Sequence, residues 1–222
     1  MLTHLGIIAD GNRRWAKERN LPTIEGHKKG LKSIEALVGA ADEAGIKYIT
    51  FYVFSTENWG RSAEEVGYIM KLAENRLPKY AEKLAKKNAR MLILGSKDHV
   101  SKSLLGAIEK AEEITRGCTG ITVCFCFNYG GEQEIVDSAN LALENNQKIT
   151  PETIRAHLYH PEVPDIDMVV RTSGEERISG FMLWRASYSE FMFIKKYFPE
   201  MTEEDVDKII AEYDSRTRRF GK

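Results

Sequence analysis

Short apolar runs alternate with longer segments of helical periodicity along the whole chain. The runs that predict β-strands are residues 5–9, 48–54, 90–94, 121–127, 167–171 and 190–194. Between the first two runs, Leu31, Ile34 and Ala41 recur at helical spacing, and Gly45 follows as a stop signal. Repeated strand–helix units of this kind favour a parallel sheet covered by helices.

Further helices are predicted along the rest of the chain. They are residues 63–88, 101–116 and 132–145, a helix that begins at Pro151, and a final helix that follows Thr202. Pro78 predicts a kink or a break in the first of these. Thr150 is a cap signal before Pro151, and Thr202 with Asp205 has the spacing of a capping box. Because no linker, repeat or break in composition divides the sequence, we expect one α/β domain over residues 1–222, with a mainly parallel six-stranded sheet flanked by helices.

The charges of the chain nearly cancel, since its 222 residues include 32 Lys and Arg and 33 Asp and Glu. A general nucleic-acid binder usually has a basic excess, so we expect no nucleic-acid partner. The N-terminus turns polar at Asp10 without a signal-peptide pattern, and no apolar run approaches the length of a membrane span. We therefore expect a soluble, cytoplasmic protein with no transmembrane segment.

The three cysteines, Cys118, Cys124 and Cys126, form no C-x-x-C pair. Cys124 and Cys126 alternate within an apolar strand pattern, so their side chains share one face. We expect small buried apolar side chains here rather than a metal or redox site.

Three polar stretches follow predicted strands and carry the candidate chemistry. They are D-G-N-R-R-W at residues 10–15, S-T-E-N-W at residues 55–59 and R-T-S-G-E at residues 171–175. Because the carboxyl ends of parallel strands share one edge, where ligands bind, we expect the three stretches to lie along that edge. One carboxylate, several arginines and many hydroxyl and amide groups suit a magnesium-bound diphosphate.

Several common signatures are absent from the sequence. It contains no G-x-G-x-x-G after the first strand, no G-x-x-x-x-G-K-[ST], no H-E-x-x-H, no G-x-S-x-G and no D-D-x-x-D. Asp165 and Asp167 form a D-x-D, which is typical of nucleotide-sugar glycosyltransferases. That pair precedes its strand, however, and is expected at the opposite edge of the sheet.

The polar stretches, together with further motifs in the same order, resemble the cis-prenyltransferase family and, within it, the bacterial undecaprenyl diphosphate synthases. The matching segments are residues 4–16, 26–30, 54–61, 128–131, 171–179, 183–184, 188–190 and 218–221. The resemblance therefore extends from His4 to Gly221, essentially the whole chain.

This resemblance implies an enzyme that uses Mg²⁺ to add isopentenyl diphosphate repeatedly to an allylic diphosphate, farnesyl diphosphate. The product would be a long Z-polyprenyl diphosphate, undecaprenyl diphosphate, which is the lipid carrier for cell-wall synthesis. It would grow inside an apolar tunnel, for which residues 63–84, Val53 and Ile121 are either lining or ordinary core. The family also implies a homodimer that delivers its product to the membrane, as a cytoplasmic protein with or without peripheral attachment.

Two alternatives stay open within the resemblance. One is a cis-prenyltransferase with a different product length, because a sequence does not measure the volume of a tunnel. The other is a non-catalytic partner subunit of a prenyltransferase complex. Such subunits characteristically lose residues of the first motif, whereas Asp10, Gly11 and Asn12 are intact here.

By resemblance, the first motif binds the allylic diphosphate. Its members are Gly11, Asn12, Arg13, Arg14 and Trp15. They lie between a strand and a helix, where backbone N–H groups and the helix dipole can meet phosphates. Asp10 would hold the magnesium ion that bridges this diphosphate, and in the family Glu190 also helps to bind magnesium. The alternatives are an N-cap role for Asp10 and an exposed strand charge for Glu190.

Isopentenyl diphosphate would occupy a neighbouring site made by Arg171, Arg177, Ile178 and Ser179. The planar donor forks of the arginines can grip phosphate, and the serine adds a hydroxyl. A surface salt bridge is the alternative for either arginine alone. The terminal Arg219, with Phe220 and Gly221, would either reach a site in the partner subunit or solvate a helix end.

Asn58 and Ser55 resemble the residues to which the family assigns removal of a proton. A neutral amide is a poor base, so we expect Asn58 to orient substrate while a diphosphate oxygen takes the proton. Capping of the loop is the alternative for both residues. Further substrate contacts are expected from His27, Thr56, Glu57, Trp59 and Arg61. The alternatives are a helix-start role for His27 and core packing for Trp15 and Trp59.

Four positions depart from the family pattern. Thr23 stands where an arginine is usual, with Glu25 nearby; Glu176 replaces His or Gln, and Gly180 replaces Asn. Arg19 is a candidate to compensate for the missing arginine, as is Arg13. These departures bear on how the protein binds its substrates and the metal ion.

Overall fold

The computed structural model describes residues 1–216, and these contain one parallel six-stranded sheet. Its strands are β1 (His4–Ile8), β2 (Tyr48–Ser55), β3 (Arg90–Leu94), β4 (Thr122–Tyr129), β5 (Met168–Arg171) and β6 (Glu190–Phe193). Their order in the sheet is β3-β4-β2-β1-β5-β6. Each strand lies within two residues of the run that predicts it, so the expected α/β class is confirmed.

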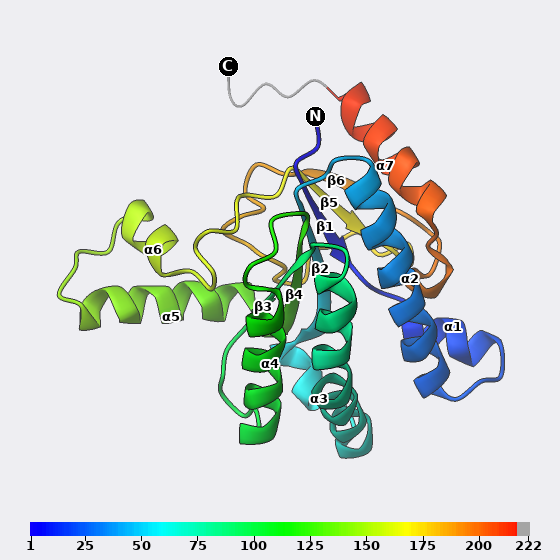
Figure 1. Ribbon diagram of the computed structural model, residues 1–222, viewed down its shortest axis with the longest axis horizontal. Helices are drawn as coiled ribbons and strands as arrows, with labels where there is room; N and C mark the ends of the chain where they lie inside the picture. The colour runs from blue at the N-terminus through cyan, green and yellow to red at the C-terminus, as the bar shows by residue number, and fades with distance from the viewer. Residues whose placement is uncertain (217–222) are drawn as a thin grey trace. The chain divides into compact units, whose positions relative to one another are not determined.

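The helices between the strands also match the sequence pattern (Figure 1). They are α1 (Asn12–Glu18), α2 (Thr23–Glu43), α3 (Ala63–Ala85), α4 (Lys102–Thr115), α5 (Gly131–Glu144), α6 (Pro151–His157) and α7 (Glu203–Ser215), with 3₁₀ turns η1 (Thr56–Gly60) and η2 (Phe198–Glu200). The predicted caps are confirmed, since Thr150 opens α6 ahead of Pro151 and Thr202 forms a capping box with Asp205. Pro78 lies inside a continuous α3, so the alternative of a break there is wrong.

The chain groups into two compact units. The first unit contains residues 1–51, 165–179 and 185 onward, and so holds β1, β5, β6, α1, α2 and α7. In it α2 packs on α1 and on α7 (Figure 1). Its fully buried core includes Leu5, Ile7, Leu37, Ile49 and Phe198.

The second unit contains residues 52–164 and 180–184, with β3, β4 and the helices α3 to α6. In it α3 packs on α4, and α5 packs on α6. Cys124 and Cys126 are fully buried in β4, as the alternation predicts. Within residues 1–216, no helix combines the length and the apolar composition that crossing a bilayer requires.

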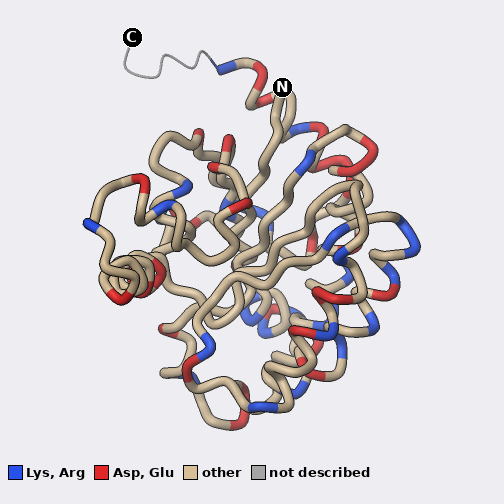
Figure 2. The backbone as a smooth tube through the Cα atoms, turned by 60° about the vertical axis from the view of Figure 1, so that its left-hand side comes forward, with Lys and Arg blue, Asp and Glu red and all other residues tan. Residues whose placement is uncertain are grey.

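Charged residues of both signs are interspersed along the backbone rather than gathered in one long stretch (Figure 2), in keeping with the near balance of charge.

The contacts of Asp167 show at which edge of the sheet the D-x-D lies. The Asp167 carboxylate accepts hydrogen bonds from the backbone N–H groups of Thr3, at 2.8 Å, and His4, at 3.0 Å. It therefore lies at the amino end of β1 and β5, the edge opposite the candidate site, as predicted.

Glycines on α2 let this helix approach the first motif closely. A Cβ at Gly26 would lie 2.0 Å from the carbonyl oxygen of Asn12, and one at Gly30 would lie 2.5 Å from the Asn12 side-chain oxygen. Gly39, on the same helix, has no atom within 4 Å of the equivalent position. The placement of α1, and with it the first motif, therefore depends on the absence of a side chain at Gly26.

The two glycines of α2 give a matched pair of substitutions. Gly39→Ala should raise the free energy of unfolding by about 0.5–1 kcal/mol, because alanine favours a helix and meets nothing here. Gly26→Ala should lower it by about 1–3 kcal/mol, because the new methyl group collides with backbone. Urea unfolding of both variants measures the difference. Equal effects at the two positions would contradict this account of the packing.

Candidate active site

The candidate site of the first unit begins where β1 ends. Gly11 is the N-cap of α1 and has a φ of 103°, in the left-handed region that favours glycine. A Cβ there would lie 2.6 Å from the Tyr197 ring. The hydroxyl of Thr172 accepts from the Asp10 N–H at 3.0 Å and donates to the Asp10 carbonyl oxygen at 2.7 Å. The turn after β1 is thus joined to the turn after β5.

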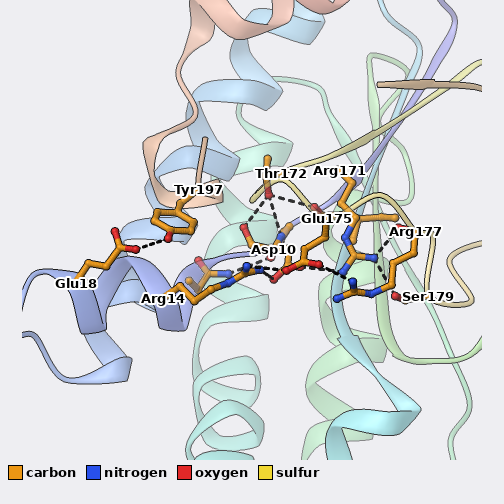
Figure 3. A network of polar contacts seen from close by, with 12 residues as sticks. Asp10, Arg14, Glu18, Arg171, Thr172, Glu175, Arg177, Ser179 and Tyr197 are labelled. Carbon is orange, nitrogen blue, oxygen red and sulfur yellow. Dashed lines mark hydrogen bonds and ion pairs between the residues drawn. The ribbon is translucent and has the colours of Figure 1, made fainter. Parts of the chain in front are cut away.

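The Asp10 side chain faces arginines and caps no helix, so the N-cap alternative is wrong. One carboxylate oxygen lies 2.9 Å from Nη2 of Arg171, and the other lies 3.2 Å from Nη2 of Arg14 (Figure 3). Burial opposes ionisation of Asp10, but the hydrogen bond and charge of Arg171, followed by those of Arg14, lower its pKa below the usual value. Asp10 is therefore a carboxylate at neutral pH.

Arg171 is the most deeply buried cation of this cluster, with only 5% of its side chain exposed. Its Nη1 donates to the carbonyl oxygen of Arg177 at 2.6 Å and to the hydroxyl of Ser179 at 2.9 Å. Arg171 therefore fixes the backbone of the loop after β5 as well as the Asp10 carboxylate. Arg177, by contrast, has a side chain that is 59% exposed.

Glu175 joins two of the arginines that were predicted to bind different substrates. Its Oε1 lies 2.7 Å from Nη1 of Arg14, and its Oε2 lies 2.5 Å from Nη1 of Arg177 (Figure 3). Hydrogen bonds from Arg177 and Arg14 lower the pKa of Glu175. The sequence analysis placed Glu175 in a polar stretch but gave it no role. Its position two residues before Arg177 was the available signal.

Several buried polar atoms around this cluster have no hydrogen-bond partner within the described structure. They are Nε of Arg171, the hydroxyl of Ser173 and the side-chain oxygen of Asn12. Buried polar groups are normally paired, so such a set marks a place where a ligand would complete the pairing. The donors among them suit phosphate oxygens.

The remaining first-motif residues lie around α1. Arg13 is exposed, and Trp15 is half-buried under the Arg19 guanidinium, which lies 4.8 Å from the centre of its ring. Arg19 also pairs with Glu200 at 2.6 Å. Arg19 is a candidate substitute for the arginine that is missing at Thr23, but its charge is already paired with that of Glu200. His27 is half-buried in α2, and Ile178 is half-buried beside Ser179.

Glu190 lies far from Asp10 within one chain. Glu190 is the first residue of β6 and is in register with Met168 of β5, which is in register with Leu5 of β1. Asp10, by contrast, lies beyond Ile8, the last residue of β1. The strand rise alone separates the two levels by about 10 Å, while ligands of one magnesium ion lie about 2 Å from it. One chain therefore cannot place both carboxylates on the same ion, and the role of Glu190 in magnesium binding stays a prediction. Glu190 instead pairs with Arg216 at 3.0 Å, and the predicted role of Arg219 lies outside the described residues.

The second unit carries the other predicted stretch, in η1 after β2. The backbone N–H of Ser55 donates to the side-chain oxygen of Asn58 at 3.2 Å, and the two residues form a capping box. The capping alternative is thus present in the structure. Thr56 donates to Glu57 at 3.0 Å, and Arg61 pairs with Glu65 at 3.1 Å.

Asn128, to which the sequence analysis assigned no role, holds η1 against a neighbouring loop. Its side-chain oxygen accepts from the Trp59 indole at 2.7 Å, and its NH₂ group donates to the carbonyl oxygens of Ser96 and Asp98, both at 2.8 Å. These residues border a pocket of about 710 Å³ at the carboxyl ends of β2, β3 and β4. The pocket is lined by Thr56, Trp59, Ser96, Asp98, His99, Asn128 and Gln133.

Known proteins resemble this chain over nearly all of its length. A family model described as "Putative undecaprenyl diphosphate synthase" matches residues 8–221. An isoprenyl transferase of Staphylococcus haemolyticus is 43% identical over 98% of this chain and 88% of its own length. A farnesyl-diphosphate-specific ditrans,polycis-undecaprenyl-diphosphate synthase of Micrococcus luteus is 39% identical, over 98% of this chain and 90% of its own.

A solved structure agrees with these relatives in fold. The crystal structure of lavandulyl diphosphate synthase from Lavandula x intermedia, in complex with dimethylallyl diphosphate, has a TM-score of 0.94 and 31% identity. The match covers 100% of this chain and 98% of that one. The site geometry and these similarities lead to one conclusion: the chain is a prenyltransferase and belongs to the undecaprenyl diphosphate synthase family.

Proposed function

We propose that this protein is a magnesium-dependent cis-prenyltransferase that condenses isopentenyl diphosphate repeatedly onto farnesyl diphosphate. The product is a long Z-polyprenyl diphosphate, undecaprenyl diphosphate, made by one catalytic domain over residues 1–222. The observation that carries the proposal is the cluster of Asp10, Arg14, Arg171 and Arg177 at the carboxyl ends of β1 and β5. The name of the Micrococcus luteus relative, a farnesyl-diphosphate-specific synthase, supports the choice of substrate.

Arginines supply the grip on both diphosphates in this proposal. Arg14 takes the allylic diphosphate together with Gly11, Asn12 and Arg13, and Arg177 takes isopentenyl diphosphate together with Ile178 and Ser179. Planar guanidinium groups bind phosphate oxygens in pairs, which fixes orientation as well as charge. The buried Nε of Arg171, which has no partner in the described structure, is a further donor. His27, Trp15, Thr56, Glu57, Trp59 and Arg61 complete the proposed substrate contacts.

Asp10 is the proposed metal ligand of each chain. Magnesium is commonly held by one or two carboxylates together with substrate phosphates and water. The ionised Asp10 fits that set, and no cluster of three potential ligands occurs among residues 1–216. When bound, magnesium neutralises charge on the diphosphate leaving group. If Glu190 binds a metal ion, it serves the site of a partner subunit, because its own Asp10 is too distant.

The reaction breaks the allylic C–O bond while the double bond of isopentenyl diphosphate forms the new C–C bond. The electron pair of the broken bond leaves with the diphosphate, and a proton then leaves the new unit for a diphosphate oxygen. In this proposal Arg14 and Arg171 stabilise the developing negative charge, and each such donor contributes on the order of 10²–10³ in rate. Asn58 and Ser55 orient the isopentenyl group.

An apolar face of α3 supports the proposed tunnel. Ile69, Leu72, Ala73 and Leu77 are only half-buried on this helix, although they are apolar. Each added five-carbon unit that is buried contributes up to about 4 kcal/mol, at roughly 0.8 kcal/mol per CH₂ group. Val53 is half-buried and fits the lining, whereas the fully packed Ile121 is ordinary core.

A homodimer and delivery of the product to the membrane are part of the proposal. Val136 and Leu143 lie two turns apart on α5 and are 50% and 56% exposed, which offers an apolar strip to a second copy. The alternative of a non-catalytic subunit is disfavoured by the intact and ionised Asp10. A different product length stays an alternative, because a protein named for lavandulyl diphosphate shares the fold.

Elongation by the purified protein tests the proposed function. Incubation with farnesyl diphosphate, labelled isopentenyl diphosphate and Mg²⁺ should give a polyprenyl diphosphate whose length chromatography reads. Chelation of the metal with EDTA should stop the incorporation of label. A correctly folded protein that incorporates no label would favour the non-catalytic alternative.

Substitution of Asp10 tests the proposed metal ligand. Asp10→Asn should lower kcat on the order of 10²–10³-fold, because a neutral amide is a poor ligand for magnesium. The fold should persist with reduced stability, because the buried ion pair is lost while the amide oxygen can still accept from Arg171. Asp165→Asn, which neutralises an exposed aspartate at the opposite edge, is the matched control and should keep wild-type turnover. Near-normal turnover of Asp10→Asn would refute the assignment.

A further inference from the structure

The Glu175 carboxylate occupies both arginines that the two substrates need. Each of its oxygens contacts one guanidinium, Arg14 at 2.7 Å and Arg177 at 2.5 Å (Figure 3). Arg14 comes from the helix after β1 and Arg177 from the loop after β5. The bridge therefore connects two binding sites that the sequence analysis treated as separate.

We propose that Glu175 is a positioning residue that couples the two diphosphate sites: it holds Arg14 and Arg177 until a substrate binds and leaves both when the first diphosphate binds. The inference rests on the proposed function and adds an energetic link between the two substrates. Carboxylate and phosphate oxygens use the same donors of a guanidinium, so Glu175 and a diphosphate compete directly for each arginine.

The first diphosphate displaces the carboxylate from both arginines because it carries more negative charge. When the allylic diphosphate reaches Arg14, it comes close to Glu175, and like charges at that distance repel. Asp10 keeps its contact with Arg171, which does not involve Glu175. The same repulsion acts on the oxygen that contacts Arg177, so the carboxylate moves away from both arginines.

The loop allows the Glu175 side chain to move while its backbone stays in place. Arg171 is buried and holds the carbonyl oxygen of Arg177 and the hydroxyl of Ser179. The side chains of Glu175 and Arg177 are 29% and 59% exposed, so both can turn into solvent without disturbing packed atoms. The fixed part and the moving part of the loop are thus distinct.

Positive coupling between the substrates results from this arrangement. Release of Glu175 reduces the affinity only for the diphosphate that binds first. The second diphosphate binds more tightly, because its arginine is no longer paired with Glu175. By linkage, each diphosphate must raise the affinity for the other by the same factor. Exposed ion pairs contribute little individually, so we expect a factor of about five.

Calorimetric titration tests the coupling without turnover. Isopentenyl diphosphate is titrated into the full-length protein with Mg²⁺, in the absence and in the presence of a thio analogue of farnesyl diphosphate that cannot react. In wild type the analogue should lower the Kd of isopentenyl diphosphate about fivefold. In Glu175→Gln the two Kd values should be equal, and isopentenyl diphosphate alone should bind at least as tightly as it does to wild type.

Glu204 provides the control, because it is an exposed carboxylate on α7 that belongs to neither proposed diphosphate site. Glu204→Gln should keep the wild-type coupling, and Glu175→Ala should repeat the result of Glu175→Gln; circular dichroism verifies the fold of each. The proposal is overturned if wild type shows no coupling, if Glu175→Gln retains it, or if Glu175→Gln weakens the binding of isopentenyl diphosphate alone. A wild-type protein that binds neither diphosphate would overturn the proposed function as well, whereas binding and elongation without coupling would overturn this inference alone.

Discussion

The ion pair between Asp10 and Arg171 is the interaction on which the rest of the site depends. Arg171 is almost fully buried, and a buried cation is tolerated only where it is paired and hydrogen-bonded. Its partners are one carboxylate, one carbonyl oxygen and one hydroxyl, and all of them belong to the turns after β1 and β5. The parallel register that sets Ile8 beside Arg171 brings these turns together. The local geometry of the site thus depends on the pairing of β1 with β5 and on the charge of Arg171, the last residue of β5.

The strands and the meeting of Asp10 with Arg171 could be predicted from the sequence. The apolar runs predict the strands, and the edge rule for parallel sheets places the turns after β1 and β5 at the same edge. That the two strands are neighbours is known only from the structure. The same rule could have placed Glu190 at the amino-end edge of the sheet, because Glu190 is the first residue of β6. Asp167 lies at that edge for the same reason, since it precedes β5. The family resemblance gave Glu190 a part in magnesium binding, and it did not specify which chain supplies the residue.

The bridges of Glu175 and Asn128 could not be predicted in the same way. Each depends on contacts with residues of loops or turns, and such segments carry no periodicity from which the contacts can be inferred. Glu175 is two residues from Arg177, but its contact with Arg14 spans most of the chain. Asn128 lies in β4 and joins η1 to the loop after β3 from a backbone φ of 51°, a left-handed conformation that asparagine tolerates better than most residues. The sequence shows that Glu175 and Asn128 are polar, but only the structure shows which residues they connect.

The geometry of η1 limits what Asn58 can do in the proposed reaction. Its side-chain oxygen accepts the backbone N–H of Ser55, and that bond is part of the capping box that shapes the turn. The oxygen is therefore already used as an acceptor, and a neutral amide has no other basic atom to receive a proton. The NH₂ group can only donate, and a diphosphate oxygen is a suitable acceptor for it. Capping and orientation of substrate are thus compatible in one side chain, whereas service as a general base is not. In the proposed reaction we therefore expect an oxygen of the diphosphate, and not Asn58, to take the proton released in each elongation step.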